Sequence, residues 1–150
     1  ESVDLIVENA LLKPPRIGRE KPWHQDSAIF DLLPTTPVIG TWIALDDADE
    51  ENGCMWVIPG SHLQGPSPHF MLTDWQLCEK DVPKQEAIPI PLKSGDCLLW
   101  HGLMYHYSPS NKSDRRRRAL QFHFCPKGIT PITKEYRLSL YSGEQLGKTC

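Results

Sequence analysis

Proline and glycine divide this chain into short segments along its whole length. The 150 residues include 14 prolines and 10 glycines, and between them lie short β-type runs with little helical periodicity. Many short strands separated by turn signals are typical of an antiparallel sandwich or barrel. A chain of this length is large enough for one core but not for two. We therefore expect a single all-β domain, a double-stranded β-helix or jelly roll with minor helix, spanning residues 1–150.

The expected strands lie between marked turns such as Asn52-Gly53, Pro59-Gly60-Ser61 and Ser94-Gly95-Asp96. They span residues 5–12, 22–26, 38–45, 54–58, 86–91, 97–100, 104–108 and 117–124. Only residues 73–80 are expected to form a short helix, with Thr73 as a possible N-cap. The tail after Pro126 shows no regular pattern.

The composition argues against several classes of protein. Apolar runs are far shorter than the roughly 20 residues that span a bilayer, and no charged-then-apolar leader is present. A net charge of -3 gives no general attraction to nucleic acid. We expect a monomer in the cytoplasm, with an organelle such as the peroxisome left open, and neither a membrane nor a nucleic acid as partner.

Five cysteines are present and none forms a C-x-x-C pair. The odd number and the spacing favour reduced thiols over a disulfide framework or a structural zinc site. The cysteines are Cys54, Cys78, Cys97, Cys125 and Cys150.

His24 and Asp26 form an H-x-D pair in the expected strand 22–26. Alternate residues of a strand project from the same face, so these two side chains could share a divalent metal ion. Two histidines and one carboxylate, with open positions opposite, are the ligand set of non-haem Fe(II) oxygenases. The pair alone is weak, because the 6 histidines and 19 acidic residues would give about 0.8 such spacings by chance.

A second group of polar residues lies between residues 101 and 124. His106 and Ser108 would share one face of a strand, and Arg117 and His123 would share a face of the next strand. An arginine and a serine on neighbouring strands near a metal-binding histidine make a clamp for a carboxylate. 2-Oxoglutarate needs such a clamp, because one end chelates iron while the distal carboxylate needs a cation.

From about Asn9 to Phe124 the chain resembles the phytanoyl-CoA dioxygenase family of Fe(II)- and 2-oxoglutarate-dependent oxygenases. Many motifs in one order are far more specific than the H-x-D pair alone. The matching motifs are Lys13-Pro14-Pro15, Trp23-His24-Gln25-Asp26, Trp42, Asn52-Gly53-Cys54, Pro59-Gly60-Ser61-His62, Gly95-Asp96 and His101-Gly102, followed by His106, Ser108, Asn111, Ser113, Arg117 and Ala119.

The resemblance implies a role for each matching site residue. Iron would be bound by His24, Asp26 and His106. The distal carboxylate of 2-oxoglutarate would be bound by Arg117 and Ser108, with Gln25 and Trp42 lining the cosubstrate site. The implied reaction uses Fe(II), 2-oxoglutarate and O2 to hydroxylate a C–H bond, and it releases succinate and CO2.

The resemblance leaves the substrate open. Family members usually carry a longer N-terminal region, whereas only 23 residues precede His24 here, so the domain is expected to lack its N-terminal part. We expect a small-molecule or acyl substrate, and Arg16, Arg19 and Lys21 could meet an anionic group on it or simply lie in an exposed loop. Asp26 argues against a related halogenase, because those enzymes keep this position vacant for halide.

Several alternatives remain open at this point. His101 and His123 could support the metal ligands or pack in the barrel. His62 could lie near the site entrance or stabilise a turn, whereas His69 is expected on the surface. The acidic run 46–51 is expected to be a solvated turn and not a calcium loop. A metal-binding cupin-type jelly roll, acting as an isomerase or a binding module, and a catalytically silent member of the fold are the competing functions.

Overall fold

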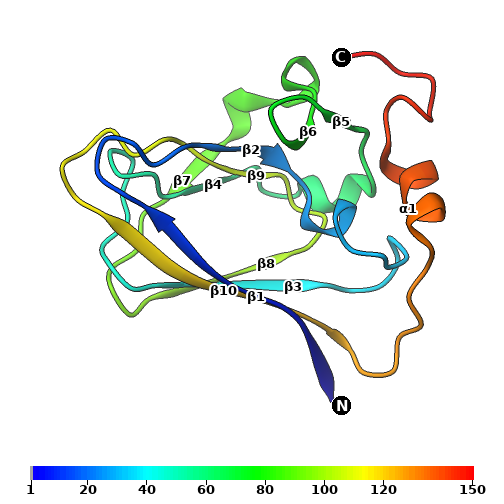
Figure 1. Cartoon of the computed structure of the whole chain (residues 1–150), viewed down its shortest axis with the longest axis horizontal. Coiled ribbons are helices and arrows are strands. Elements are labelled where there is room, and N and C mark those ends of the chain that lie inside the picture. Colours follow the sequence, from blue (N-terminus) through cyan, green and yellow to red (C-terminus); the bar gives the residue numbers. More distant parts are fainter. Residues whose placement is uncertain (1) are drawn as a thin grey trace.

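Two four-stranded antiparallel sheets form the body of the molecule in the computed structural model, which describes residues 2–150 (Figure 1). The first sheet has the order β1 (Val3–Lys13), β10 (Arg117–Pro126), β3 (Ile39–Ala44), β8 (Cys97–His101). The second has the order β2 (Lys21–His24), β9 (His106–Ser108), β4 (Met55–Val57), β7 (Ile88–Ile90). The two sheets face each other in Figure 1, and the prediction of a jelly roll is confirmed.

Smaller elements gather at one end of the two sheets. The hairpin of β5 (His69–Met71) and β6 (Trp75–Leu77) and the helix α1 (Lys134–Tyr141) lie there, on the right of Figure 1. The 3-10 turns are η1 (Asp26–Ala28), η2 (Ser61–Gln64), η3 (Glu79–Asp81) and η4 (Lys84–Glu86). Within residues 2–150, no helix has both the length and the apolar character that a membrane crossing would require.

Strand β10 organises the first sheet. It pairs with β1 on one side and β3 on the other, and its residues alternate between buried and half-buried along its whole length. The buried face carries Arg117, Gln121 and His123 into the space between the sheets, as the alternation of the sequence predicted. The same space holds an apolar cluster of Trp42, Ala44, Ala48, Cys54, Met55, Val57, Trp100 and Ala119.

A glycine lets two strands of this sheet pack closely. A Cβ atom at Gly40 would lie 2.4 Å from Cε2 of Trp100, the residue opposite it on β8. Any larger residue would displace the indole. The position of Trp100 matters because its ring reaches the functional site described below.

Each of the eight predicted strands overlaps one observed strand, but two local predictions are wrong. Residues 73–80 hold β6 and the start of η3 instead of a helix, because the Trp75 indole packs inward and donates to Ala28 O at 3.1 Å. The tail after Pro126 contains α1, which Thr133 caps by accepting a hydrogen bond from the Tyr136 N–H. Eight residues are too short to show a helical period in the sequence.

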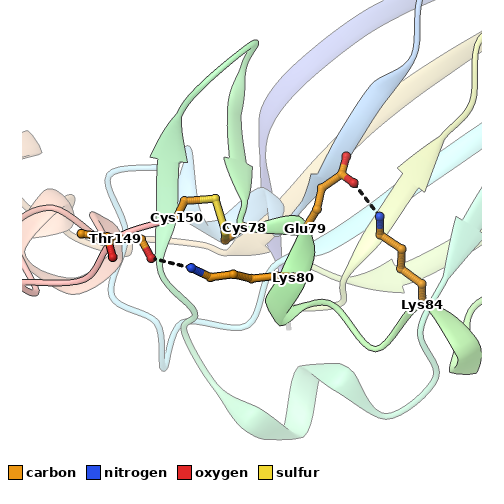
Figure 2. Close-up of a disulfide and its surroundings, with 6 residues drawn as sticks. All are labelled: Cys78, Glu79, Lys80, Lys84, Thr149 and Cys150. Atoms are coloured by element: carbon orange, nitrogen blue, oxygen red, sulfur yellow. Dashed lines mark hydrogen bonds and ion pairs between the residues drawn. A yellow bond between two sulfur atoms is a disulfide. The ribbon is translucent and has the colours of Figure 1, made fainter.

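A disulfide joins Cys78, just before η3, to Cys150 (Figure 2). Beside it the Lys80 ammonium donates to Thr149 O at 3.2 Å, so the last residues are held against η3. The prediction of five reduced thiols is therefore wrong for this pair, while Cys54 and Cys125 are buried free thiols and Cys97 an exposed one. The sequence carried no signal for the bond, because its partners lie 72 residues apart and only the fold brings them together.

Candidate metal centre and cosubstrate cavity

His24, Asp26 and His106 come together between the two sheets. His24 ends β2 and lies directly opposite His106 on β9. Asp26 does not continue the strand as predicted, but begins the turn η1, which brings its carboxylate back towards both imidazoles. Its Oδ1 lies 3.4 Å from His24 Nε2 and 3.5 Å from His106 Nε2, and all three side chains are buried.

Hydrogen bonds to backbone carbonyls fix the proton on each imidazole. His24 Nδ1 lies 2.7 Å from Pro22 O, and His106 Nδ1 lies 3.0 Å from Met104 O. A carbonyl can only accept, so Nδ1 carries a hydrogen in both rings, and Nε2 is the ring nitrogen that faces Asp26. Although burial opposes it, the Asp26 carboxylate raises the pKa of His106 in the absence of a metal ion. Burial, and the neighbouring His106, lower the pKa of His24 and favour its neutral form.

This donor set fits a non-haem iron ion. Two imidazole nitrogens and one carboxylate oxygen lie within 4.8 Å of one another, and residues 2–150 contain no second group of three such ligands. Neutral nitrogen and anionic oxygen donors suit Fe(II), and three ligands on one side leave positions for other molecules.

The second oxygen of Asp26 is held by two donors. Trp100 Nε1 and His123 Nε2 each lie 2.8 Å from Asp26 Oδ2. Burial alone would raise the pKa of Asp26, but His106, His123 and His24 together lower it well below the usual range. The carboxylate is therefore charged, with Oδ1 free to bind a metal. His123 supports the ligands, as one of the two open interpretations proposed. Trp100 was not identified from sequence, because a tryptophan in a strand usually signals core packing.

A cavity of about 540 Å³ opens beside the three ligands. Of the four residues that the resemblance assigned to the cosubstrate site, Arg117, Ser108 and Trp42 line this cavity and Gln25 does not. Its lining includes Leu11, Lys13, Phe30, Trp42, Met55, Ser108 and Arg117.

Arg117 is a buried cation with free donors in this cavity. Its side chain is only 2% exposed, and Nε and Nη1 have no hydrogen-bond partner within residues 2–150. The guanidinium lies over the Trp42 ring, 5.2 Å from the centroid. Burial lowers the pKa of Arg117 to about 10, so the side chain stays charged at neutral pH. A buried guanidinium without a protein partner is suited to bind a carboxylate from outside the chain.

The three neighbouring arginines have a different environment. Arg115 pairs with Asp49, and both Arg116 and Arg118 pair with Asp46. The acidic run 46–51 thus meets the outward-facing arginines, and it forms no cluster that could hold a metal ion within the described residues. Of these four arginines only Arg117 lines the cavity, since Arg115 and Arg116 precede β10 and Arg118 lies on its other face.

Gln25 does not line the cavity. Its carboxamide donates to Gly65 O at 2.9 Å and Leu103 O at 2.8 Å, and it accepts from the Ser67 N–H at 2.9 Å. The structure therefore places this side chain among loop backbones, away from the cosubstrate position that the resemblance implied.

His69 is fully buried, so the expectation that it lies on the surface is wrong. Its Nε2 accepts the Gln25 N–H at 3.0 Å, and its Nδ1 donates to Ser67 O at 2.8 Å. Trp75 and Tyr141 lie against the ring and shield it, and neither contact could be read from the prolines around His69. His69 thereby holds the backbone between His24 and Asp26.

Two of the three basic residues singled out before His24 form ion pairs. Arg16 forms an ion pair with Asp114 outside the cavity, and Lys21 pairs with Asp74 at 2.5 Å in its wall. Arg19 also lines the cavity. His62 and His101 lie beside each other, 5.4 Å between ring centroids, but do not contribute to the cavity wall.

Comparison with known proteins gives a consistent picture. Residues 2–119 match the family model of phytanoyl-CoA dioxygenase (PhyH). The chain is 41% identical over 133 residues to phytanoyl-CoA dioxygenase domain-containing protein 1 of Danio rerio, covering 83% of this chain and 46% of that protein. It is 30% identical over 126 residues to the peroxisomal phytanoyl-CoA dioxygenase of Mus musculus, covering 75% and 36%. The chain thus spans less than half the length of these relatives.

Solved structures with the same fold include enzymes with bound cosubstrate. EvdO2 from Micromonospora carbonacea var. aurantiaca, complexed with 2-oxoglutarate, matches with a TM-score of 0.73 and 29% identity over 88% of this chain and 55% of its own. The epimerase SnoN, in complex with Fe3+, alpha ketoglutarate and nogalamycin RO, matches with a TM-score of 0.72 and 25% identity over 87% and 53%. The non-heme monooxygenase ThoJ matches with a TM-score of 0.77 and 26% identity over 87% and 49%.

The family match covers most of the chain, and the buried group of two histidines and one aspartate agrees with it. The chain belongs to the phytanoyl-CoA dioxygenase (PhyH) family of iron- and 2-oxoglutarate-dependent oxygenases.

Proposed function

We propose that this chain carries the active centre of an Fe(II)- and 2-oxoglutarate-dependent dioxygenase. The enzyme would hydroxylate a C–H bond of a small-molecule or acyl substrate and release succinate and CO2. One observation carries the proposal: the ligand group His24, Asp26 and His106 lines the same cavity as the buried, unpaired guanidinium of Arg117. Iron bound by this group would supply the activation of O2 at the expense of 2-oxoglutarate.

The protein's own residues hold and orient the reactants. His24 and His106 would bind the metal through Nε2, and Asp26 through Oδ1, while Trp100 and His123 keep the other carboxylate oxygen in place. Arg117 and Ser108 would bind the distal carboxylate of 2-oxoglutarate, with Trp42 beneath the guanidinium. This orientation would leave the keto acid end at the metal.

The reaction that follows C–H activation is a separate part of the proposal. Similar structures include a monooxygenase and an epimerase, ThoJ and SnoN, so both outcomes occur on this fold. We propose hydroxylation. Asp26 argues against halogenation, because it occupies the ligand position that a halogenase leaves vacant, and the choice between hydroxylation and epimerisation is open to a direct test. The two outcomes differ in mass: hydroxylation adds an oxygen atom from 18O2 to the product, whereas epimerisation leaves the mass unchanged.

The substrate would reach the metal past a rim of mixed charge. Arg19 and the ion pair of Lys21 with Asp74 lie in the cavity wall, together with Glu20. Arg16 is engaged with Asp114 outside the cavity. Of Arg16, Arg19 and Lys21, only Arg19 forms no ion pair among the described residues. An anionic group on the substrate would therefore meet Arg19.

The competing proposal is a metal-binding jelly roll without oxygenase activity. Such a protein would need His24, Asp26 and His106 but would have no use for an unpaired buried Arg117. Succinate formation from 2-oxoglutarate with Fe(II), ascorbate and O2 tests the difference. We expect slow succinate formation without substrate, loss of it in His106→Ala, and a need for much higher 2-oxoglutarate in Arg117→Ala. Equal rates in all three proteins, or no succinate from the parent at saturating iron and cosubstrate, would contradict the proposal.

A further inference from the structure

We propose that Lys13 acts with Arg117 and Ser108 as a second cationic anchor for the distal carboxylate of 2-oxoglutarate. The inference rests on the oxygenase function proposed above and adds a residue to its cosubstrate site.

Lys13 and Arg117 are direct neighbours across two strands. Lys13 ends β1, and it lies opposite Arg117, the first residue of β10. Residues directly opposite each other on paired strands project from the same face of the sheet. Both side chains are buried, at 7% and 2% exposure, and both line the cavity beside the metal ligands.

The Lys13 ammonium is fixed on the strand segment that also carries the proposed clamp serine. Its Nζ donates to Ser108 O at 2.9 Å and to Pro109 O. An ammonium group has three N–H donors, so one remains for a ligand in the cavity. With the two unpaired nitrogens of Arg117, this corner of the site offers donors that no described residue satisfies.

The two cations have no carboxylate partner. The titratable groups facing Lys13 are Arg117 on β10, the thiol of Cys54 before β4 and Glu20 before β2, and among the described residues none forms an ion pair with it. Burial and the charge of Arg117 lower the pKa of Lys13 to about 7, against smaller opposing effects of Glu20 and Cys54. Two buried like charges are unfavourable without an anion between them.

An entering carboxylate would reverse this balance. It would favour the charged form of Lys13, so the free protein, partly deprotonated above pH 7, would take up a proton as 2-oxoglutarate binds. Affinity for 2-oxoglutarate should then fall as the pH rises from 7 to 9. Arg117 does not lose its proton in this range, so the effect would belong to Lys13.

A structural role for Lys13 is the alternative that the test must separate. The same side chain holds the two carbonyls that begin the turn between β9 and β10, and its own carbonyl accepts from Asn111. Loss of that support would disturb the whole site and weaken every ligand. Loss of a carboxylate anchor would weaken only ligands that carry the distal carboxylate.

The experiment is calorimetric titration of the Co(II)-loaded protein with 2-oxoglutarate and with 2-oxopentanoate. The second ligand keeps the keto acid and the chain length but has a methyl group in place of the distal carboxylate. We expect Lys13→Met to weaken the binding of 2-oxoglutarate about 10- to 100-fold, the range of a lost charged hydrogen bond. The affinity for 2-oxopentanoate should stay within about twofold of the parent value. The exposed Lys127→Met is the matched control and should change neither.

Proton uptake gives an independent reading. Titration at pH 8 in two buffers of different ionisation enthalpy should show uptake of most of one proton per 2-oxoglutarate in the parent. Lys13→Met should show almost none. Lys13→Arg should bind 2-oxoglutarate well without proton uptake, because arginine stays charged. Equal weakening of both ligands in Lys13→Met, or equal proton uptake in all variants, would overturn the inference.

Failure of this inference would differ from failure of the proposed function. If the metal-loaded parent binds no 2-oxoglutarate at all, the oxygenase function is wrong. If the parent binds it, Arg117→Ala weakens it and Lys13→Met does not, only the role of Lys13 is wrong.

Discussion

His69 should control how firmly the proposed metal ligands His24 and Asp26 are held, through the backbone that joins them. Its imidazole accepts the backbone N–H of Gln25, the residue between His24 and Asp26, at 3.0 Å. The substitution His69→Phe keeps a flat ring of similar size and removes the acceptor. Gln25 is fully buried, so its N–H would have no replacement partner.

The magnitude follows from that single unsatisfied donor. A buried N–H without a partner costs about 1–3 kcal/mol, and this should appear as a lower free energy of unfolding of the metal-free protein. If the backbone from His24 to Asp26 instead relaxes in the metal-free protein, metal binding must restore its conformation. The same energy then corresponds to roughly 5- to 150-fold weaker metal binding. Urea denaturation and Co(II) titration measure the two effects.

His69→Gln is the matched control. The carboxamide oxygen of glutamine can reach the position of Nε2 and accept the same hydrogen bond, so stability and metal affinity should largely return. If the free energy of unfolding of His69→Phe lies within about 0.5 kcal/mol of the parent value and the Co(II) affinity is unchanged, the hydrogen bond does not hold the proposed ligands.

Three further predictions concern stability and the iron ligands. Reduction of the disulfide, or Cys150→Ser, should lower the free energy of unfolding by up to about 4 kcal/mol, because the bond closes a loop across 72 residues. Urea denaturation with and without reductant tests this. The control Cys97→Ser, at an exposed free thiol, should leave the free energy of unfolding unchanged. Burial lowers the pKa of His69 to about 3, below its unfolded value, so the unfolded chain binds the extra proton. As the pH drops below about 6.5, the free energy of unfolding should therefore fall more steeply in the parent than in His69→Gln, by up to about 1.4 kcal/mol per pH unit. Parallel curves of unfolding free energy against pH for the two proteins would contradict this. Trp100→Phe removes one donor to Asp26 and should weaken Co(II) binding measurably while His123 remains; unchanged affinity would assign Trp100 to packing alone.

The sheets could be predicted because their signals are local. Residues 117–126 alternate between buried and half-buried, so Arg117 and His123 share the buried face, as period-2 alternation predicted. The choice of Arg117 over its arginine neighbours also used its spacing from His106 in the family motif. The eight predicted strands were found for the same reason. The residues proposed as ligands were identified by spacing and motif order, although Asp26 reaches the others from a turn and not from the strand.

Contacts between distant parts of the chain could not be predicted. The partners of Asp26 come from β8 and β10, and those of Gln25 from the loops around Gly65 and Leu103. Lys13 was visible only as part of a motif, because its burial beside Arg117 depends on the pairing of the first and last strands. In each case the chemistry depends on strand register and loop closure, which leave no trace in the neighbouring residues.

We propose above all that 2-oxoglutarate binds an iron ion in this cavity with Arg117 at its far end. Anaerobic titration of the Fe(II)-loaded protein with 2-oxoglutarate, followed by the weak visible charge-transfer band of the chelate, tests it most directly. We predict a band in the parent and in Arg116→Ala, and a need for far more 2-oxoglutarate in Arg117→Ala. No band in a parent with iron demonstrably bound would contradict it.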